Sequence, residues 1–119
     1  MNHELAALLG NFADQLTADQ IADLERVADR IDGRFPVAEL DDTAPAMEAL
    51  SGASMVALGD ETVETLAAGL RAARAAAERA YQQLAGAMMW EQQHTGESDY
   101  KLAARTGQAR GTVRKALGL

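Results

Sequence analysis

Apolar side chains recur at intervals of three and four residues through most of the chain, and no stretch alternates regularly between apolar and polar positions. The first spacing is typical of amphipathic helices, whereas regular alternation would indicate half-buried strands. We therefore predict an all-α protein. The repeats define a first helix over residues 2–15, a second from residue 17 to about 31, a third that starts near Pro45, and a long helix over 61–93.

The first two helices are expected to form a hairpin. Thr17 and Gln20 have the spacing of a capping box, which marks the start of the second helix. The apolar positions expected to face inward in the three N-terminal helices are Leu5, Leu8, Leu9, Phe12, Leu16, Ile21, Leu24, Ala28, Ile31, Met47, Leu50, Met55, Val56 and Leu58.

The long helix carries an apolar seam with a seven-residue repeat, formed by Val63, Leu66, Leu70, Ala73, Ala77, Ala80, Leu84 and Ala87. At 1.5 Å per residue the helix would be roughly 50 Å long. Such a seam is typical of coiled coils, and its small alanines require a partner helix that comes unusually close. The partner is either the N-terminal hairpin or the same helix of a second subunit, and we favour a homodimer.

The last segment, residues 99–119, predicts two short helices separated by a glycine. Ser98 is expected to cap the first helix, and Gly107 permits the tight turn that follows it. The second helix should run from about Ala109 to Leu117. The residues expected to form the core of this part, together with the end of the long helix, are Leu84, Met88, Met89, Trp90, Leu102, Ala103, Thr106, Val113, Ala116 and Leu117.

These patterns divide the chain into an acidic helical region over 1–58, a connecting helix over 59–96 and a terminal helical module over 97–119. The formal net charge is −7, but residues 1–70 hold three arginines and fourteen acids, whereas residues 71–119 hold eight basic residues and four acids. The asymmetry indicates a basic C-terminal part joined to an acidic N-terminal part, and a basic module is typical of nucleic-acid binding.

Composition argues against several other classes. The absence of cysteine excludes disulfides and thiolate metal sites, and the two histidines are far apart in the sequence. No carboxylate pair or glycine-rich phosphate loop stands out, so we expect neither an enzyme nor a cofactor or metal centre. Asp41 and Asp42 fit helix capping better than cation binding. Without a leader or a membrane span, a cytoplasmic protein is expected.

The residues Leu102-Ala103-Ala104-Arg105-Thr106-Gly107, followed by Arg110-Gly111-Thr112-Val113-Arg114 and Ala116-Leu117, resemble the DNA-reading head of GntR family regulators. The resemblance covers about a sixth of the chain and implies a helix-turn-helix, in which a second helix enters the major groove. Members of that family continue into a two-stranded wing. No wing is expected here after Leu119, and Gln108 occupies a turn position that is usually apolar.

If DNA is bound, Arg110 and Arg114 lie one turn apart on the second helix and are placed to contact guanine or phosphate. Gly111 would permit close approach of the backbone, and Thr112 would reach a base or a phosphate. The remaining expected contacts, mainly to phosphates, are Tyr100, Lys101, Arg105, Gln108 and Lys115.

The sequence therefore predicts a dimeric, sequence-specific double-stranded DNA-binding protein, a bacterial or phage transcription regulator. A symmetric dimer would place two recognition helices roughly 34 Å apart. The alternative is a non-enzymatic interaction or scaffold protein, whose acidic part binds a partner and whose terminal hairpin only packs. A further hypothesis is that the acidic half covers the basic end of its own chain.

Overall fold

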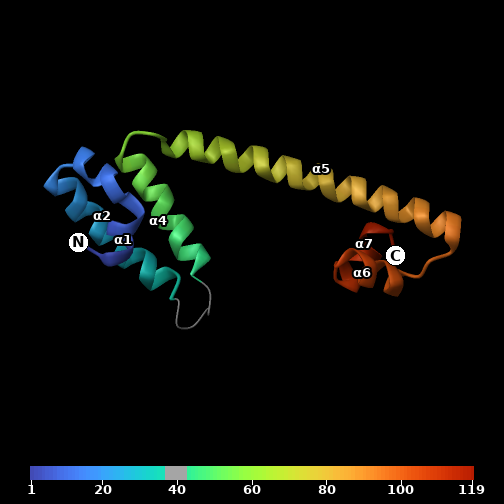
Figure 1. Ribbon diagram of the computed structural model, residues 1–119. Coiled ribbons are helices and arrows are strands. Elements are labelled where there is room, and N and C mark those ends of the chain that lie inside the picture. Colours follow the sequence, from blue (N-terminus) through green and yellow to red (C-terminus); the bar gives the residue numbers. More distant parts are fainter. Residues whose placement is uncertain (37–42) are drawn as a thin grey trace. The chain divides into compact units, whose positions relative to one another are not determined.

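The computed structural model describes residues 1–36 and 43–119, and the chain is helical with no strand in these residues, which confirms the all-α class. Figure 1 shows the elements in order from α1 to α7. They group into two compact units, Met1–Ala68 and Gly69–Leu119. This division differs from the three predicted regions because its single boundary falls inside the long helix.

The first helix, α1 (His3–Leu9), is shorter than predicted. The chain continues as a 3-10 helix, η1 (Gly10–Gln15), and Gly10 adopts a φ of 52°, a left-handed value that ends the α-helical repeat. The change of helix type rotates the following side chains away from the expected face. Phe12 is consequently 56% exposed, so its prediction as an inward-facing residue was wrong.

The second helix, α2 (Ala18–Arg34), starts where the sequence predicts and has the complete capping box. The backbone N–H of Gln20 donates to Thr17 Oγ1 over 3.1 Å, and the Thr17 N–H donates to Gln20 Oε1 over 2.8 Å. Leu24 and Ala28 are buried, as expected. The helix passes through Gly33 and ends three residues later than the predicted stripe.

The third helix of this unit, α4 (Ala44–Ala57), has Pro45 in its first turn and continues through Gly52. Its buried face consists of Ala46, Leu50 and Ser54, at four-residue spacing. Leu50 is buried and Leu58 packs against the core, as predicted, whereas Met47, Met55 and Val56 are 37–39% exposed, so their prediction as inward-facing residues was wrong. Asp41 and Asp42, considered for capping or cation binding, lie outside the described residues.

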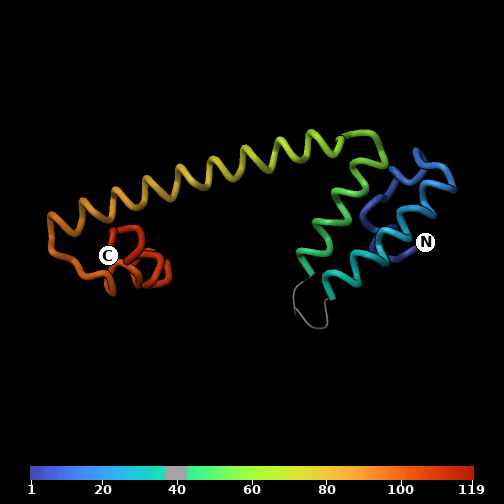
Figure 2. Tube along the Cα trace, turned by 180° about the vertical axis from the view of Figure 1, so that it is seen from behind, coloured from blue at the N-terminus to red at the C-terminus, as the bar shows by residue number. Residues whose placement is uncertain are grey.

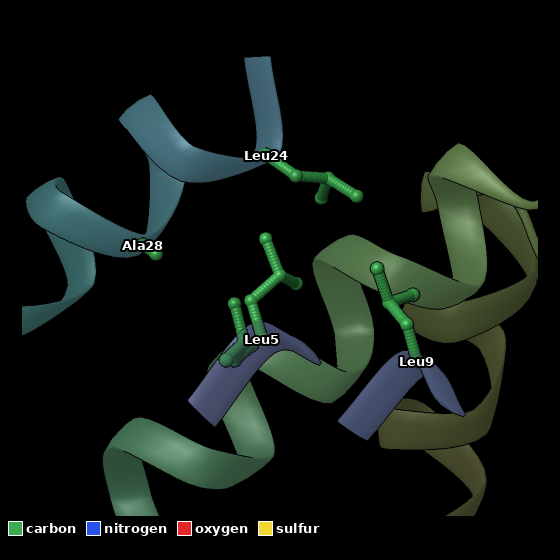
Figure 3. Packing of buried hydrophobic residues seen from close by; sticks show 5 residues of the cluster. Leu5, Leu9, Leu24 and Ala28 are labelled. Carbon is green, nitrogen blue, oxygen red and sulfur yellow. The ribbon is translucent and has the colours of Figure 1, made fainter. Parts of the chain in front are cut away.

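Leu5, Leu9, Leu24, Ala28 and Leu50 form the core of the N-terminal unit. Figure 3 shows Leu5 and Leu9 pointing from α1 toward the space between the other two helices. The three helices contact one another pairwise, and Figure 2 shows them side by side. The N-terminal unit is thus a packed group of three helices, one more than the two predicted to pair.

The long helix, α5 (Val63–Thr95), is uninterrupted over 33 residues, and neither Gly69 nor Gly86 breaks it. It ends at Gly96, whose φ is 72° and whose N–H donates to the Gln92 carbonyl over 2.8 Å. Two short helices follow, α6 (Asp99–Thr106) and α7 (Arg110–Ala116). None of the described helices is both long and apolar enough to cross a bilayer.

Candidate nucleic-acid interface

The start of α6 and the turn after it follow from local sequence signals. The Lys101 N–H donates to Ser98 Oγ over 3.1 Å, which is the predicted cap. Gly107 adopts the left-handed conformation with φ 73°, and its N–H donates to the Ala103 carbonyl over 3.0 Å. A side chain at this position would be strained, so glycine fixes where α6 ends and how α7 departs.

The C-terminal unit has its own hydrophobic core, formed by Ala85 and Met88 of α5, Leu102 of α6, and Val113 and Ala116 of α7. Leu102 and Val113 have no exposed surface. Burial of Leu102, Val113 and Ala116 confirms the predicted inner faces of the two short helices. The C-terminal end of α5 is therefore the third helix of this unit, as expected.

The face that α5 presents to this core agrees with the prediction at Leu84 and Met88 and differs from it at the neighbouring positions. It runs through Tyr81, Leu84, Ala85 and Met88, whereas Ala87 is exposed. Met89 and Trp90 are 47% and 63% exposed, so their prediction as core residues was wrong. Each step of one residue turns a helix by about 100°, which moves both side chains off the face that Met88 occupies. Trp90 instead stacks on His94, with ring centroids 4.6 Å apart.

The outer face of α7 carries basic side chains and a glycine. Arg110, Gly111, Arg114 and Lys115 are all exposed, while Val113 and Ala116 point into the core. A Cβ built on Gly111 meets no other atom within 4 Å, so this part of the helix surface is open. The predicted recognition residues of α7 therefore share one accessible face, and Thr112 lies half-buried at its edge.

Arg110 and Arg114 converge on a single carboxylate. Arg110 Nε donates to Asp99 Oδ2 over 3.2 Å, and Arg114 Nη1 donates to the same oxygen over 2.9 Å. The side chain of Asp99 is only 13% exposed, whereas those of Arg110 and Arg114 are 59% and 49% exposed. The carboxylate thus lies under the two guanidinium groups and joins the first residue of α6 to the outer face of α7.

The surroundings of Asp99 favour its ionised form. The hydrogen bond from Arg114 is the largest influence and, with those from Arg110 and the Tyr100 backbone N–H, it holds the pKa of Asp99 below its ordinary value of 3.8. Partial burial acts in the opposite direction but does not prevail. Asp99 therefore carries its negative charge throughout the neutral range and down to acidic pH.

Arg105 of α6 is also paired, with one acid in the last turns of α5 and one in the connection between α5 and α6. Its Nη2 lies 3.4 Å from Glu91 Oε2, and its Nη1 lies 3.5 Å from Glu97 Oε1. Lys101 and Lys115 have no ion pair within residues 1–36 and 43–119. Of the predicted basic contacts, the arginines are each neutralised in part by a carboxylate, whereas the two lysines are not, as far as the described part of the chain shows.

The other predicted contact residues are accessible. Tyr100 is 69% exposed, and Gln108 is exposed in the turn, where its N–H donates to Thr106 Oγ1 over 3.4 Å. The Thr106 hydroxyl also donates to the Leu102 carbonyl over 2.7 Å. Thr106 thus occupies the inside of the turn, and Gln108 remains available to solvent.

The acidic partners of the arginines, Asp99, Glu91 and Glu97, were not predicted from the sequence. Asp99 is 11 and 15 residues from Arg110 and Arg114, spacings that no single helix brings together. The only signal was an acid at the first position of a helix, which the helix dipole alone is sufficient to explain.

A second exposed surface lies on α5. Val63, Leu66 and Leu70 are 69%, 37% and 51% exposed, and Ala73, Ala77 and Ala80 are also exposed. Val63 and Leu66 line an open apolar groove of about 570 Å³, with Leu24 and Val27 of α2 and Ala53 and Val56 of α4. The N-terminal two-thirds of the predicted seam is therefore uncovered in the single chain.

Among the described residues, no group of three or more His, Asp or Glu side chains is arranged to hold a metal ion. Comparison of the chain with protein-family models, curated proteins and solved structures found no match.

Proposed function

We propose that the chain is a double-stranded DNA-binding protein that reads the major groove with α7 and acts as a transcription regulator. The observation that carries this proposal is the outer face of α7, where Arg110, Arg114 and Lys115 surround Gly111 on an open surface. Arginine forks match guanine and phosphate, and glycine permits the close approach that a groove requires.

The geometry around α7 supports the same function. The helix is short and is held on its inner side by Val113 and Ala116, so its whole outer side is available. Lys101 and Lys115 lie outside the arginine pair and carry uncompensated charge suited to backbone phosphates.

We also propose that the protein acts as a homodimer through α5. Three large apolar side chains at its N-terminal end, Val63, Leu66 and Leu70, lie in line with the exposed alanines of the seam. Leaving this much apolar surface in water is unfavourable, and a second copy of the helix has the complementary small side chains. The groove that shares Val63 and Leu66 would extend the buried area.

The proposal is tested by titrating the full chain with a fluorescent mixed-sequence duplex of about 21 base pairs, two helical turns, over a range of salt concentrations. We expect binding that weakens with salt, with a slope of log K against log salt of about −2 to −4, because each neutralised phosphate contributes about −0.9. Absence of binding at low salt, measured by fluorescence anisotropy, would contradict the proposal and favour the interaction protein.

A further inference from the structure

Asp99 lies in a position that the DNA-binding proposal by itself does not explain. A carboxylate next to a phosphate-binding surface weakens that surface, since it repels the phosphates and occupies the basic groups. Here one oxygen receives hydrogen bonds from both arginines of the recognition helix, at 3.2 and 2.9 Å. The three side chains together carry one net positive charge instead of two.

We infer that Asp99 is a positioning residue that restricts Arg110 and Arg114 to base recognition and suppresses their use as general phosphate ligands. This inference rests on the proposed function. The geometry also supports it, because Asp99 accepts a hydrogen bond from only one nitrogen of each arginine among the described contacts, Nε of Arg110 and Nη1 of Arg114. Each guanidinium keeps its other N–H groups for an acceptor outside the protein.

The burial of Asp99 determines which acceptor groups of DNA can compete with it for the N–H groups of the two arginines. Its side chain is 13% exposed and lies under arginines that are about half exposed, so DNA contacts the arginines and not the carboxylate. A single phosphate oxygen offers an arginine little more than Asp99 already does. A guanine edge presents two acceptors, O6 and N7, to the free N–H groups of an arginine whose direction is already fixed. Asp99 would therefore lower affinity for any sequence while preserving affinity for the correct one.

The two lysines are suited to phosphate binding, a different role from the base recognition that we infer for the arginines. Lys101 and Lys115 are exposed and have no ion pair among the described residues, so they remain free to bind phosphates of any sequence. General attraction to DNA then depends on lysines, and discrimination between sequences depends on the arginines that Asp99 orients.

The test compares Asp99→Asn with Glu78→Gln in the full chain, using the mixed-sequence duplex. Both variants lose one negative charge from the C-terminal unit, but within the described residues the Glu78 side chain accepts a hydrogen bond only from Gln82 Nε2, over 2.8 Å. We expect Asp99→Asn to bind this duplex about 10-fold more tightly than Glu78→Gln at low salt. Its salt slope should be steeper by about 0.9, the value for one additional neutralised phosphate. Circular dichroism verifies that both variants are folded.

If Asp99 served only to stabilise the start of α6, the asparagine variant would bind the mixed duplex equally or more weakly, with an unchanged slope. Either result would overturn the inference while leaving the proposed function intact, provided that the parent binds. If the parent and both variants fail to bind DNA, the proposed function fails and the inference fails with it.

Discussion

Replacing both Arg110 and Arg114 with alanine is expected to weaken binding of the site selected from random duplexes by about 100-fold at low salt. Two arginine contacts to base edges or phosphates are together worth roughly 2–4 kcal/mol, and each 1.4 kcal/mol changes the affinity tenfold. Fluorescence anisotropy with the full chain measures the loss directly. The effect is large because these side chains occupy the centre of the only basic face on α7 within the described residues.

The matched control for this double variant is Arg71→Ala/Arg74→Ala. These arginines lie on the exposed middle of α5, so the control removes the same charge from another surface of the same unit. We expect it to change the affinity less than about threefold, the effect of screened charge alone. Adding Asp99→Asn to the first variant removes the carboxylate that would otherwise remain unpaired, and binding should stay weak. If the double variant is folded and binds as tightly as its control, α7 is not the recognition helix.

Replacing Ala77 with aspartate is expected to convert the dimer to monomers at about 10–50 µM chain, where the parent should still be dimeric. Ala77 lies in the exposed seam of α5, and a symmetric interface would bury one new carboxylate from each chain without a partner. A loss of several kcal/mol corresponds to more than a 100-fold weaker association. Sedimentation equilibrium distinguishes the mass of two chains from that of one.

Ala75→Asp provides the control for the seam variant. Ala75 is exposed on the same helix, two residues away and therefore about 200° around its axis, so the substitution has the same helix propensity and the same charge. We expect this variant to remain dimeric. A parent that sediments as one chain, or two variants that associate equally well, would contradict dimerisation through the seam.

The sequence predicts features that depend on residues close together in the chain. The capping box of Thr17 and Gln20, the cap at Ser98 and the left-handed Gly107 each involve side chains and backbone groups within four residues. The bounds of α6 and α7 follow from these signals, and Leu102 and Val113 follow from the apolar spacing. All of these features agree between sequence and structure.

The sequence predicted less well which residues of each helix face the core. An apolar residue adjacent to the buried stripe, such as Met47 or Trp90, satisfies the same spacing rules as a buried one, and only the packing partner selects between them. In α5 the buried face passes through Ala85 because the short helices contact it there. Phe12 failed for a different reason, since the positive φ of Gly10 changes the helix type before that residue.

The residues of the candidate site also differ in whether the sequence predicts their role. Its basic residues are visible in the sequence because they cluster in the last 19 positions, from Lys101 to Leu119. Their acidic partners are not visible, because Asp99 reaches α7 only after the Gly107 turn has folded the two helices together. The net charge of the outer face of α7 is thus a property of the tertiary structure.

Selection of bound sequences from a pool of random duplexes tests most directly whether the protein reads DNA. We expect enrichment of one site with guanines in two inverted half-sites, whose centres are separated by about one helical turn, 10–10.5 base pairs, or by a multiple of it. The inverted repeat reflects the two-fold symmetry of a dimer, and the guanines reflect Arg110 and Arg114. Recovery of no enriched sequence over successive rounds would contradict the central claim.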